Sequence, residues 1–207
     1  YGITRAGEHS WSDPVTLASF ATAIVSAIVF LFLQKRSKSP MLPLNLFSDR
    51  NRSGSYLAML FVGAGLMGTF YLLTLYLQEV LHFSPLKTGF SSLPFSIGII
   101  FGSVVSSKLA ERFAPRAIAA PGLVLATIGM YWLFTLTTDS SFASHILPAV
   151  FITTFGLGIA AVTLTLTAVH RVAEQQTGVA SALINMSQQI GAALGLSVFT
   201  TVATSVA

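Results

Sequence analysis

Six long apolar segments dominate this chain, and each is free of Asp, Glu, Lys, Arg and His. They run from Val15 to Gln34, Gly54 to Gln78, Gly89 to Ser107, Ile118 to Thr138, Ile146 to Val169 and Gly178 to Thr204. A helix rises 1.5 Å per residue, so about 20 residues cross the roughly 30 Å hydrocarbon core of a bilayer. The segments are too long for barrel strands and lack their strict alternation. The sequence therefore predicts an all-α membrane protein with six transmembrane helices.

Composition supports a protein whose main solvent is lipid. Hydrophobic residues make up 53% of the chain and charged residues 9%, whereas about a quarter of the residues in a soluble domain are charged. The net charge of +4 does not indicate a nucleic-acid partner, because the charges lie between the apolar segments and form no patch. The absence of cysteine excludes disulfides and thiolate metal sites. The chain begins at Tyr1 without a signal peptide, so we expect an internal or C-terminal piece of a longer protein.

The basic residues indicate how the helices are oriented. The first, third and fifth connections hold all the Lys and Arg residues except Arg5 and Lys87. By the positive-inside rule these connections are cytoplasmic, and the first helix enters from outside. The basic residues in them are Lys35, Arg36, Lys38, Arg50, Arg52, Lys108, Arg112, Arg116 and Arg171. The acidic residues and histidines also lie outside the apolar segments, and they are Glu8, His9, Asp13, Asp49, Glu79, His82, Glu111, Asp139, His145, His170 and Glu174.

Proline marks one bend and one connection. Pro94 lies about five residues inside the third segment and should kink that helix, whereas Pro121 is expected near a helix start, where its missing N–H costs little. The connection from Lys35 to Arg52 has prolines around an apolar stretch from Met41 to Phe47. This pattern predicts an interfacial elbow between two helical units.

Glycine motifs in the apolar segments favour close helix packing. Residues Gly63 to Gly68 match the dinucleotide-binding fingerprint, but that fingerprint needs a preceding strand and an acidic residue about 20 positions later. Here it lies inside an apolar helix, so we expect its glycines to let neighbouring helices approach. The spacings Gly98 to Gly102 and Gly191 to Gly195 are interpreted in the same way.

Rows of neutral polar residues predict a substrate cavity. In the sixth segment Ser181, Asn185 and Gln188 recur at helical spacing beside Gln189, and the amides either bond between helices or line a water-filled cavity. The second segment carries Met67, Tyr71, Thr74 and Gln78 on one face, and the third carries Ser92, Ser96, Ser103 and Ser107. For the serines, close packing is the favoured interpretation. The candidate cavity residues are Tyr71, Thr74, Gln78, Ser92, Ser96, Asn185, Gln188 and Gln189.

The segments offer no chemistry for catalysis. No aspartate pair, Ser–His arrangement or zinc-binding set of two His and a Glu lies within them, so no catalytic residue, metal site or cofactor is predicted. Glu79, at the outer end of the second segment, is not expected to carry protons, because nothing indicates that it is buried. His170, Arg171 and Glu174 form either a solvated loop or a gating contact at the cytoplasmic end.

The third cytoplasmic connection resembles a known loop signature. Residues Ser107 to Arg116 are similar to the Gly-x-Leu-Ala-Asp-Arg-x-Gly-x-Arg/Lys loop of the major facilitator superfamily. Leu109, Ala110, Arg112 and Arg116 match, Glu111 replaces the Asp, and Ser107 and Ala114 replace the glycines. The resemblance implies a cytoplasmic gating loop formed by Lys108, Glu111, Arg112 and Arg116.

Further motifs resemble the fourteen-span drug:proton antiporters of the EmrB/QacA type. These are Pro43 to Phe47 with Arg50, Tyr76 to Leu81 followed by Ser84 to Gly89, and Gly178 to Ala182 with Asn185 and Gln189 to Gly191. The resemblance implies that residues 1–52 form one extra central helix with a cytoplasmic interfacial linker. Residues 53–207 would then form the first five helices of the C-terminal bundle.

The implied function is proton-coupled multidrug efflux by alternating access. The expected partners are the lipid bilayer, a hydrophobic or cationic small molecule, protons and a missing N-terminal half, and the expected location is a bacterial cell membrane. Export of an endogenous metabolite or lipid, and a membrane scaffold that transports nothing, are the alternatives. The coupling group is expected in the missing half, since the apolar segments carry no charge.

Overall fold

The structure is a computed structural model that describes residues 2, 5, 6, 10, 12–37, 42–135, 137 and 141–206, with side chains to residue 201. Every regular element in these residues is helical, and six helices are long and apolar enough to cross a membrane. The predicted all-α fold with six spans is confirmed. Several sequence predictions fall partly outside the described residues, namely those on Tyr1, Glu8, His9, Lys38, Met41, Thr138 and Asp139.

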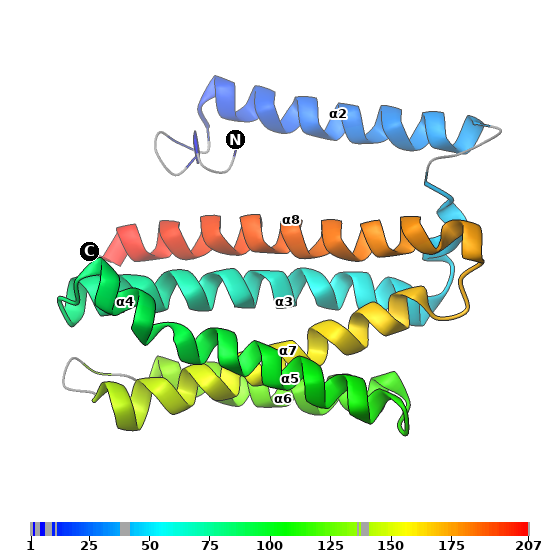
Figure 1. Ribbon diagram of the computed structural model, residues 1–207. Coiled ribbons are helices and arrows are strands. Elements are labelled where there is room, and N and C mark those ends of the chain that lie inside the picture. The colour runs from blue at the N-terminus through cyan, green and yellow to red at the C-terminus, as the bar shows by residue number, and fades with distance from the viewer. Residues whose placement is uncertain are drawn as a thin grey trace.

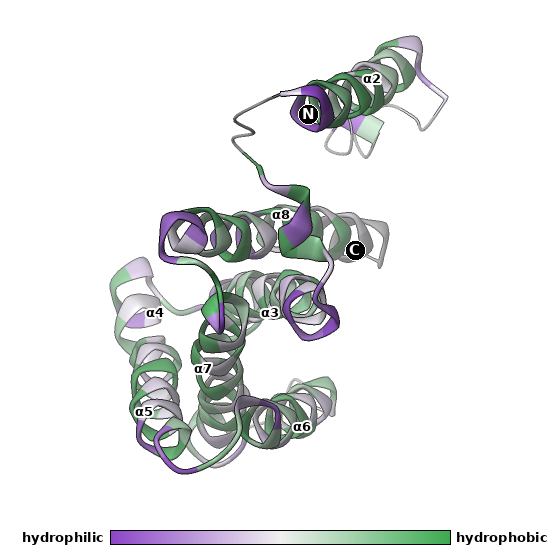
Figure 2. Ribbon diagram, turned by 90° about the vertical axis from the view of Figure 1, so that its right-hand side faces the viewer, coloured by the Kyte–Doolittle hydropathy of each residue, from purple (hydrophilic) through white to green (hydrophobic). Residues whose placement is uncertain are grey.

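The first span is helix α2, Pro14–Arg36. It begins where the Thr16 amide donates to a carboxylate oxygen of Asp13 at 3.2 Å, and Pro14 occupies the first turn. Lys35 and Arg36 lie in the last turn, where cations complement the helix dipole. Figures 1 and 2 show α2 set apart from the other helices, and nearly all of its side chains are exposed.

A short 3-10 turn, η1 (Leu44–Phe47), leads from this helix into the second span. Leu46 of η1 is fully buried in the main apolar core, so the connection is anchored to the helix bundle. The second span is α3, Arg50–Leu75, continued by a π-helical turn, η2 (Tyr76–Val80). Because Asp49 caps α3, this helix starts a turn earlier than the predicted Gly54.

The third span is two helices rather than one. A short helix α4, Pro85–Ser91, stops at Ser92, and α5, Leu93–Ala110, continues from there. Pro94 lies in the first turn of α5, where its ring tolerates a helix start but not a continuous helix from α4. The sequence predicted a bend at Pro94, and the structure has a break at Ser92, two residues earlier.

The last three spans alternate in direction. They are α6 (Pro115–Phe134), α7 (Leu147–Val169), which follows a π-helical turn η3 (Phe142–Ile146), and α8 (Glu174–Val206). The expectation that Pro121 lies near a helix start is wrong. Helix α6 begins at Pro115, whose fixed φ suits a first turn, and Pro121 lies inside the helix.

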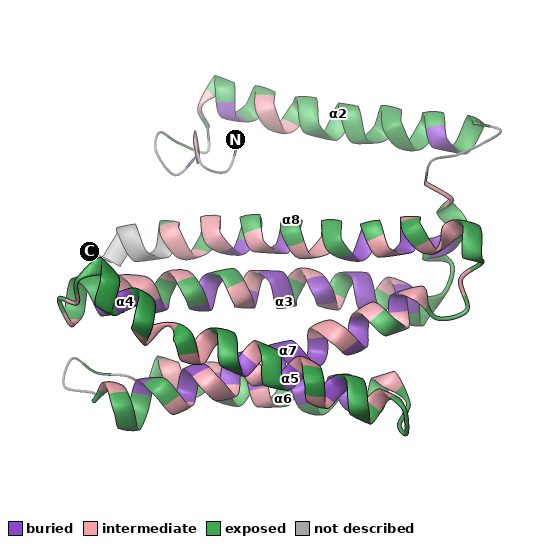
Figure 3. Cartoon of the chain, viewed as in Figure 1, coloured by how far each residue is buried: buried purple, intermediate pink, exposed green. Residues whose placement is uncertain are grey.

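Helix α7 is the centre of the bundle. Helices α5 and α6 pack on it, α3 packs on it from another side, and α8 packs mainly on α3 (Figures 1 and 3). The buried residues of α7 include the small Ala149, Gly156, Gly158 and Ala160, which allow this crowding. Figure 2 looks onto the end with most basic residues and shows hydrophilic residues concentrated at helix ends and connections. Apolar side chains cover the remaining outward faces, as expected for helices surrounded by lipid.

Candidate functional site

The glycine motifs form the seam between α3 and α8. A methyl group at Gly63 would overlap the backbone of Gln188, and one at Gly191 would overlap the backbone of Leu60. Methyl groups at the two other glycines of the fingerprint would meet side chains instead: Met130 of α6 and Leu157 of α7 at Gly65, and Phe199 of α8 at Gly68. The packing interpretation of this motif is therefore confirmed, since neighbouring helices fill the space beside each glycine.

This seam fixes the axial register of α3 relative to α8. Leu60, Ala64 and Gly68 of α3 lie opposite Gly191, Gly195 and Phe199 of α8. The two helices therefore run parallel, and Figure 1 shows both starting at the same end of the bundle. Tyr71 lies one turn beyond the level of Phe199, whereas Asn185 lies about 17 residues, or roughly 25 Å, nearer the helix starts.

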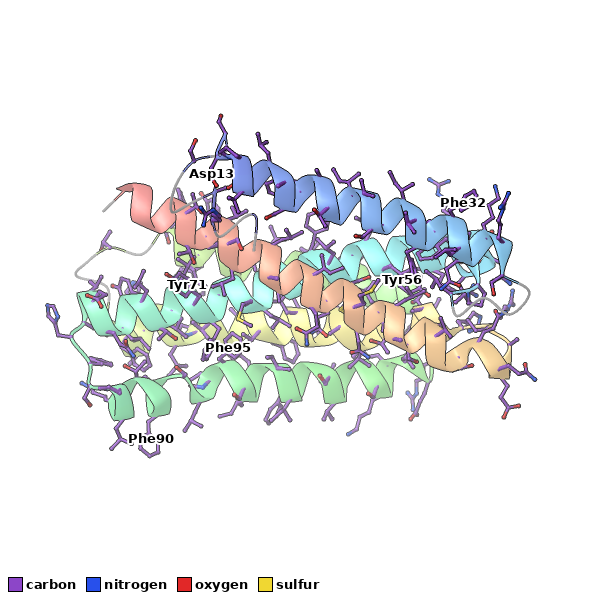
Figure 4. All side chains as sticks on the ribbon, turned by 90° about the horizontal axis from the view of Figure 1, so that it is seen from above. Asp13, Phe32, Tyr56, Tyr71, Phe90 and Phe95 are labelled. Atoms are coloured by element: carbon purple, nitrogen blue, oxygen red, sulfur yellow. The ribbon has the colours of Figure 1, made fainter. Side chains whose placement is uncertain are left out.

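The candidate cavity residues consequently form two groups rather than one. Tyr71, Thr74 and Gln78 lie toward the C-terminal end of the second span, away from the basic end, and Ser92 is at the break of the third span. The amides of α8 lie in the half nearer the basic end. Figure 4 shows Tyr71 and Tyr56 in opposite halves of α3. The polar rows were predicted as one cavity, although their positions in the predicted spans already differ in depth.

The amide row of α8 divides between two faces. Asn185 and Gln189 are exposed, whereas Gln188 is half-buried on the side that meets Gly63. The side-chain nitrogen of Asn185 donates to the Ser181 carbonyl oxygen at 3.0 Å, within its own helix. Asn185 is therefore not bonded between helices in the described part of the chain, and its amide retains hydrogen-bonding capacity for a ligand, water or another segment.

Two candidate cavity residues of the second and third spans bond within their own helices. The Thr74 hydroxyl donates to the Phe70 carbonyl at 2.8 Å, and the Ser92 hydroxyl donates to the Thr88 carbonyl at 2.9 Å. Ser96 is exposed. Ser96 therefore does not pack closely against another helix of this chain. Aromatic side chains join α3 to α5 instead, since the rings of Phe70 and Phe95 meet edge-on at 5.4 Å.

One buried polar contact was missed by sequence reasoning. Ser106 of α5 is fully buried, and its hydroxyl donates to the Ile159 carbonyl at 3.1 Å and lies 3.0 Å from the Thr163 hydroxyl. The residue continues the four-residue spacing of Gly98 and Gly102, which pack on α7. That spacing was the signal that could have identified it.

A hollow lies beside α3. It has a volume of about 400 Å³ and lies between those halves of α3, α6 and α8 that are farther from the basic end. Its lining is mostly apolar and includes Thr69, Leu73, Tyr76, Leu133 and Phe199. None of the candidate cavity residues lines it.

The gating-loop residues are exposed at the basic end. Lys108, Glu111, Arg112 and Arg116 are all open to solvent around the turn between α5 and α6. In the described part of the chain the ion pair is that of Arg5 with Asp13, and the residues of this loop form no ion pair there. The loop is thus free to contact a segment outside this chain.

A buried arginine lies at the same end. Arg52, in the first turn of α3, donates to the Leu46 carbonyl of η1 at 3.4 Å and to the His170 carbonyl at 3.3 Å. His170 ends α7, and Arg171 follows with a left-handed φ of 53°. Arg52 therefore ties three segments together, a role that the count of basic residues did not reveal.

Comparison with known proteins places this arrangement in a family. Residues 6–196 match the Major Facilitator Superfamily. The chain belongs to the major facilitator superfamily. Its six apolar helices, together with its similarity to bacterial proteins, make it a multi-pass protein of a bacterial membrane. Members of this superfamily are transporters and are not generally enzymes.

Superfamily members, two of them named for resistance or efflux, match nearly the whole chain. It is 34% identical over 207 residues to the puromycin resistance protein pur8 of Streptomyces alboniger, covering 99% of this chain and 41% of that protein. It is 32% identical over 206 residues to the MFS-type transporter EfpA of Mycobacterium tuberculosis, covering 99% and 39%. The multidrug efflux pump LfrA of Mycolicibacterium smegmatis is 29% identical over 201 residues, covering 97% and 40%. The chain thus spans about two fifths of the length of these relatives.

Proposed function

We propose that this chain is part of a transporter that exports hydrophobic or cationic drug-like solutes by alternating access, coupled to proton entry. The observation that carries the proposal is the match of the whole chain to superfamily proteins named for antibiotic resistance and multidrug efflux. The uncharged spans fit solutes that bind through aromatic and amide groups. Catalysis is no part of this proposal.

The contacts of the chain support its proposed division into two parts. Residues 1–52 would supply an extra central helix, because α2 stands apart from the bundle, and residues 53–207 would supply five of the six helices of one transporter half. The 400 Å³ hollow beside α3 supports a missing sixth helix. An apolar helix seated there would cover Leu72 and Phe134, which are exposed in this chain.

The substrate would meet this half at two depths. Asn185 and Gln189 offer exposed amides in the cytoplasmic half of α8, and Tyr71 offers a half-buried ring nearer the outer end. A pathway with contacts at both depths suits alternating access, in which a solute entering from one side leaves by the other. The proton-carrying group would lie in the other half of the transporter, where its pKa could change with exposure.

Efflux by the full-length protein tests this proposal. Bacteria expressing it are loaded with the fluorescent cation ethidium, and efflux is followed with and without a protonophore. We expect expression to speed efflux and the protonophore to abolish the gain. Efflux that persists without the gradient would overturn proton coupling, and an absence of efflux for ethidium and puromycin would favour the metabolite exporter or the scaffold.

A further inference from the structure

The first turn of α3 contains a buried cation without a carboxylate partner. Arg52 is 9% exposed, and the ion pairs in the described residues do not include it. Its two terminal nitrogens reach only carbonyl oxygens, those of Leu46 and His170, at the long end of the hydrogen-bond range. A buried guanidinium is costly unless its donors are satisfied.

Two buried donors at this place have no acceptor. The Arg52 Nε and the Tyr56 hydroxyl are both fully buried, and neither has a hydrogen-bond partner in the structure. Tyr56 lies one helical turn after Arg52, so the two side chains project from the same side of α3. Unsatisfied buried donors are rare in native proteins, and each needs an explanation.

The segment that Arg52 holds is the connection between α7 and α8. His170 ends α7 with an extended backbone, and the left-handed φ of Arg171 turns the chain toward Glu174, the first residue of α8. A left-handed conformation in an arginine is strained and persists only where its surroundings maintain it. Helix α8 packs on α3 far more than on α7, so this connection joins the central helix to the α3–α8 pair.

We propose that Arg52 is a positioning residue that clamps the α7–α8 connection in this arrangement, and that Arg52 Nε and the Tyr56 hydroxyl gain acceptors in a second arrangement reached during transport. The incompletely satisfied donors raise the free energy of the present arrangement and therefore favour departure from it. This proposal rests on the proposed transport function. Under this proposal the α7–α8 connection moves at the cytoplasmic end, and it is separate from the loop between α5 and α6.

The experiment measures ethidium efflux rate against ethidium concentration for the full-length protein and three variants. Tyr56→Phe removes only the unpaired hydroxyl, and Arg52→Lys keeps the charge but cannot bridge two carbonyls. Arg50→Lys is the matched control, since Arg50 is exposed in the same turn of α3. We expect Tyr56→Phe and Arg52→Lys to lower the maximal rate about tenfold with an unchanged half-saturating concentration, and Arg50→Lys to behave as wild type.

Thermal unfolding in detergent separates a mechanistic role from a structural one. In the arrangement described here the Tyr56 hydroxyl is unpaired, so Tyr56→Phe should keep or raise the unfolding temperature while it slows transport. Wild-type rates in both variants would overturn the proposal, and so would a Tyr56→Phe loss that is matched by a lower unfolding temperature. If the wild-type protein itself moves no solute, the failure lies with the proposed function rather than with the clamp.

Discussion

Individual side chains of α8 show where water is expected in the assembled transporter. Asn185 and Gln189 are exposed, whereas Leu183 is buried against the bundle. A free amide facing lipid would be costly, so the exposed pair should face an aqueous cavity.

Cysteine substitution at these positions tests that expectation. In the full-length protein, Asn185→Cys and Gln189→Cys should react with a water-soluble maleimide, and Leu183→Cys should stay protected. The measurement is the labelling rate in membranes open at both faces. Equal protection of all three positions would count against a cavity and in favour of a covering protein surface.

A second residue-scale expectation concerns pH and Asp13, which lies just before α2. Its carboxylate accepts from Arg5 at 2.9 Å and from the Thr16 amide, and the Arg5 hydrogen bond is the main reason its pKa is held below the ordinary 3.8. Because the folded pKa is depressed, the stabilisation is present above the unfolded pKa and is lost as pH falls through the folded one.

Protection of the Thr16 amide against hydrogen exchange should therefore stay constant from pH 7 to about pH 4 and fall below 3.8. Asp13→Asn is the control, because asparagine still caps a helix but does not titrate in this range. Loss of protection already near pH 5, to the same extent in both proteins, would show that another group is responsible.

At the scale of helices, the predictable features are those that depend on the length of each apolar segment and on lipid as its solvent. Six spans were predictable because only a long apolar helix satisfies its backbone in lipid. Boundaries differed by up to a turn, since caps such as Asp49 lie outside the apolar segments. The places of Tyr71 and Asn185 in their predicted spans already imply different depths, but the exact register between α3 and α8 was not predictable. That register is set by tertiary contact at glycines rather than by the pattern of either helix.

The glycine seam makes a testable prediction for this helix pair. Gly191→Leu places a side chain into the backbone of Leu60 and should destabilise the fold by about 1–3 kcal/mol, the usual cost of overpacking. Gly178→Ala, in the same helix but with nothing within 4 Å, should be neutral or stabilising by up to about 1 kcal/mol. Unfolding in a denaturing detergent measures both, and similar stabilities would contradict the close approach seen here.

For the whole molecule, we propose that the basic end contacts the other half of the transporter. The exposed loop between α5 and α6 carries Arg112 beside Glu111, with no ion pair within the described chain. Contacts that form and break as two halves rock would explain exposed charges at this place.

Arg112→Gln should therefore lower ethidium efflux by about tenfold in the full-length protein while leaving its amount in the membrane unchanged. Arg50→Gln removes an exposed charge from the same side and should leave efflux intact. Transport and membrane content are measured on the same cells. Normal efflux by the Arg112 variant would remove the loop from the gating mechanism.

The central place of α7 has a consequence for how the protein is made. Helix α3 leaves the ribosome well before α7 and α8, yet these two are its principal neighbours, and α5 likewise precedes the helix it packs on. The early spans must therefore remain in the bilayer or at the insertion machinery with their small-residue faces unoccupied. Assembly can finish only after the fifth span arrives, so a chain cut short before Leu147 would be inserted but would not acquire a bundle.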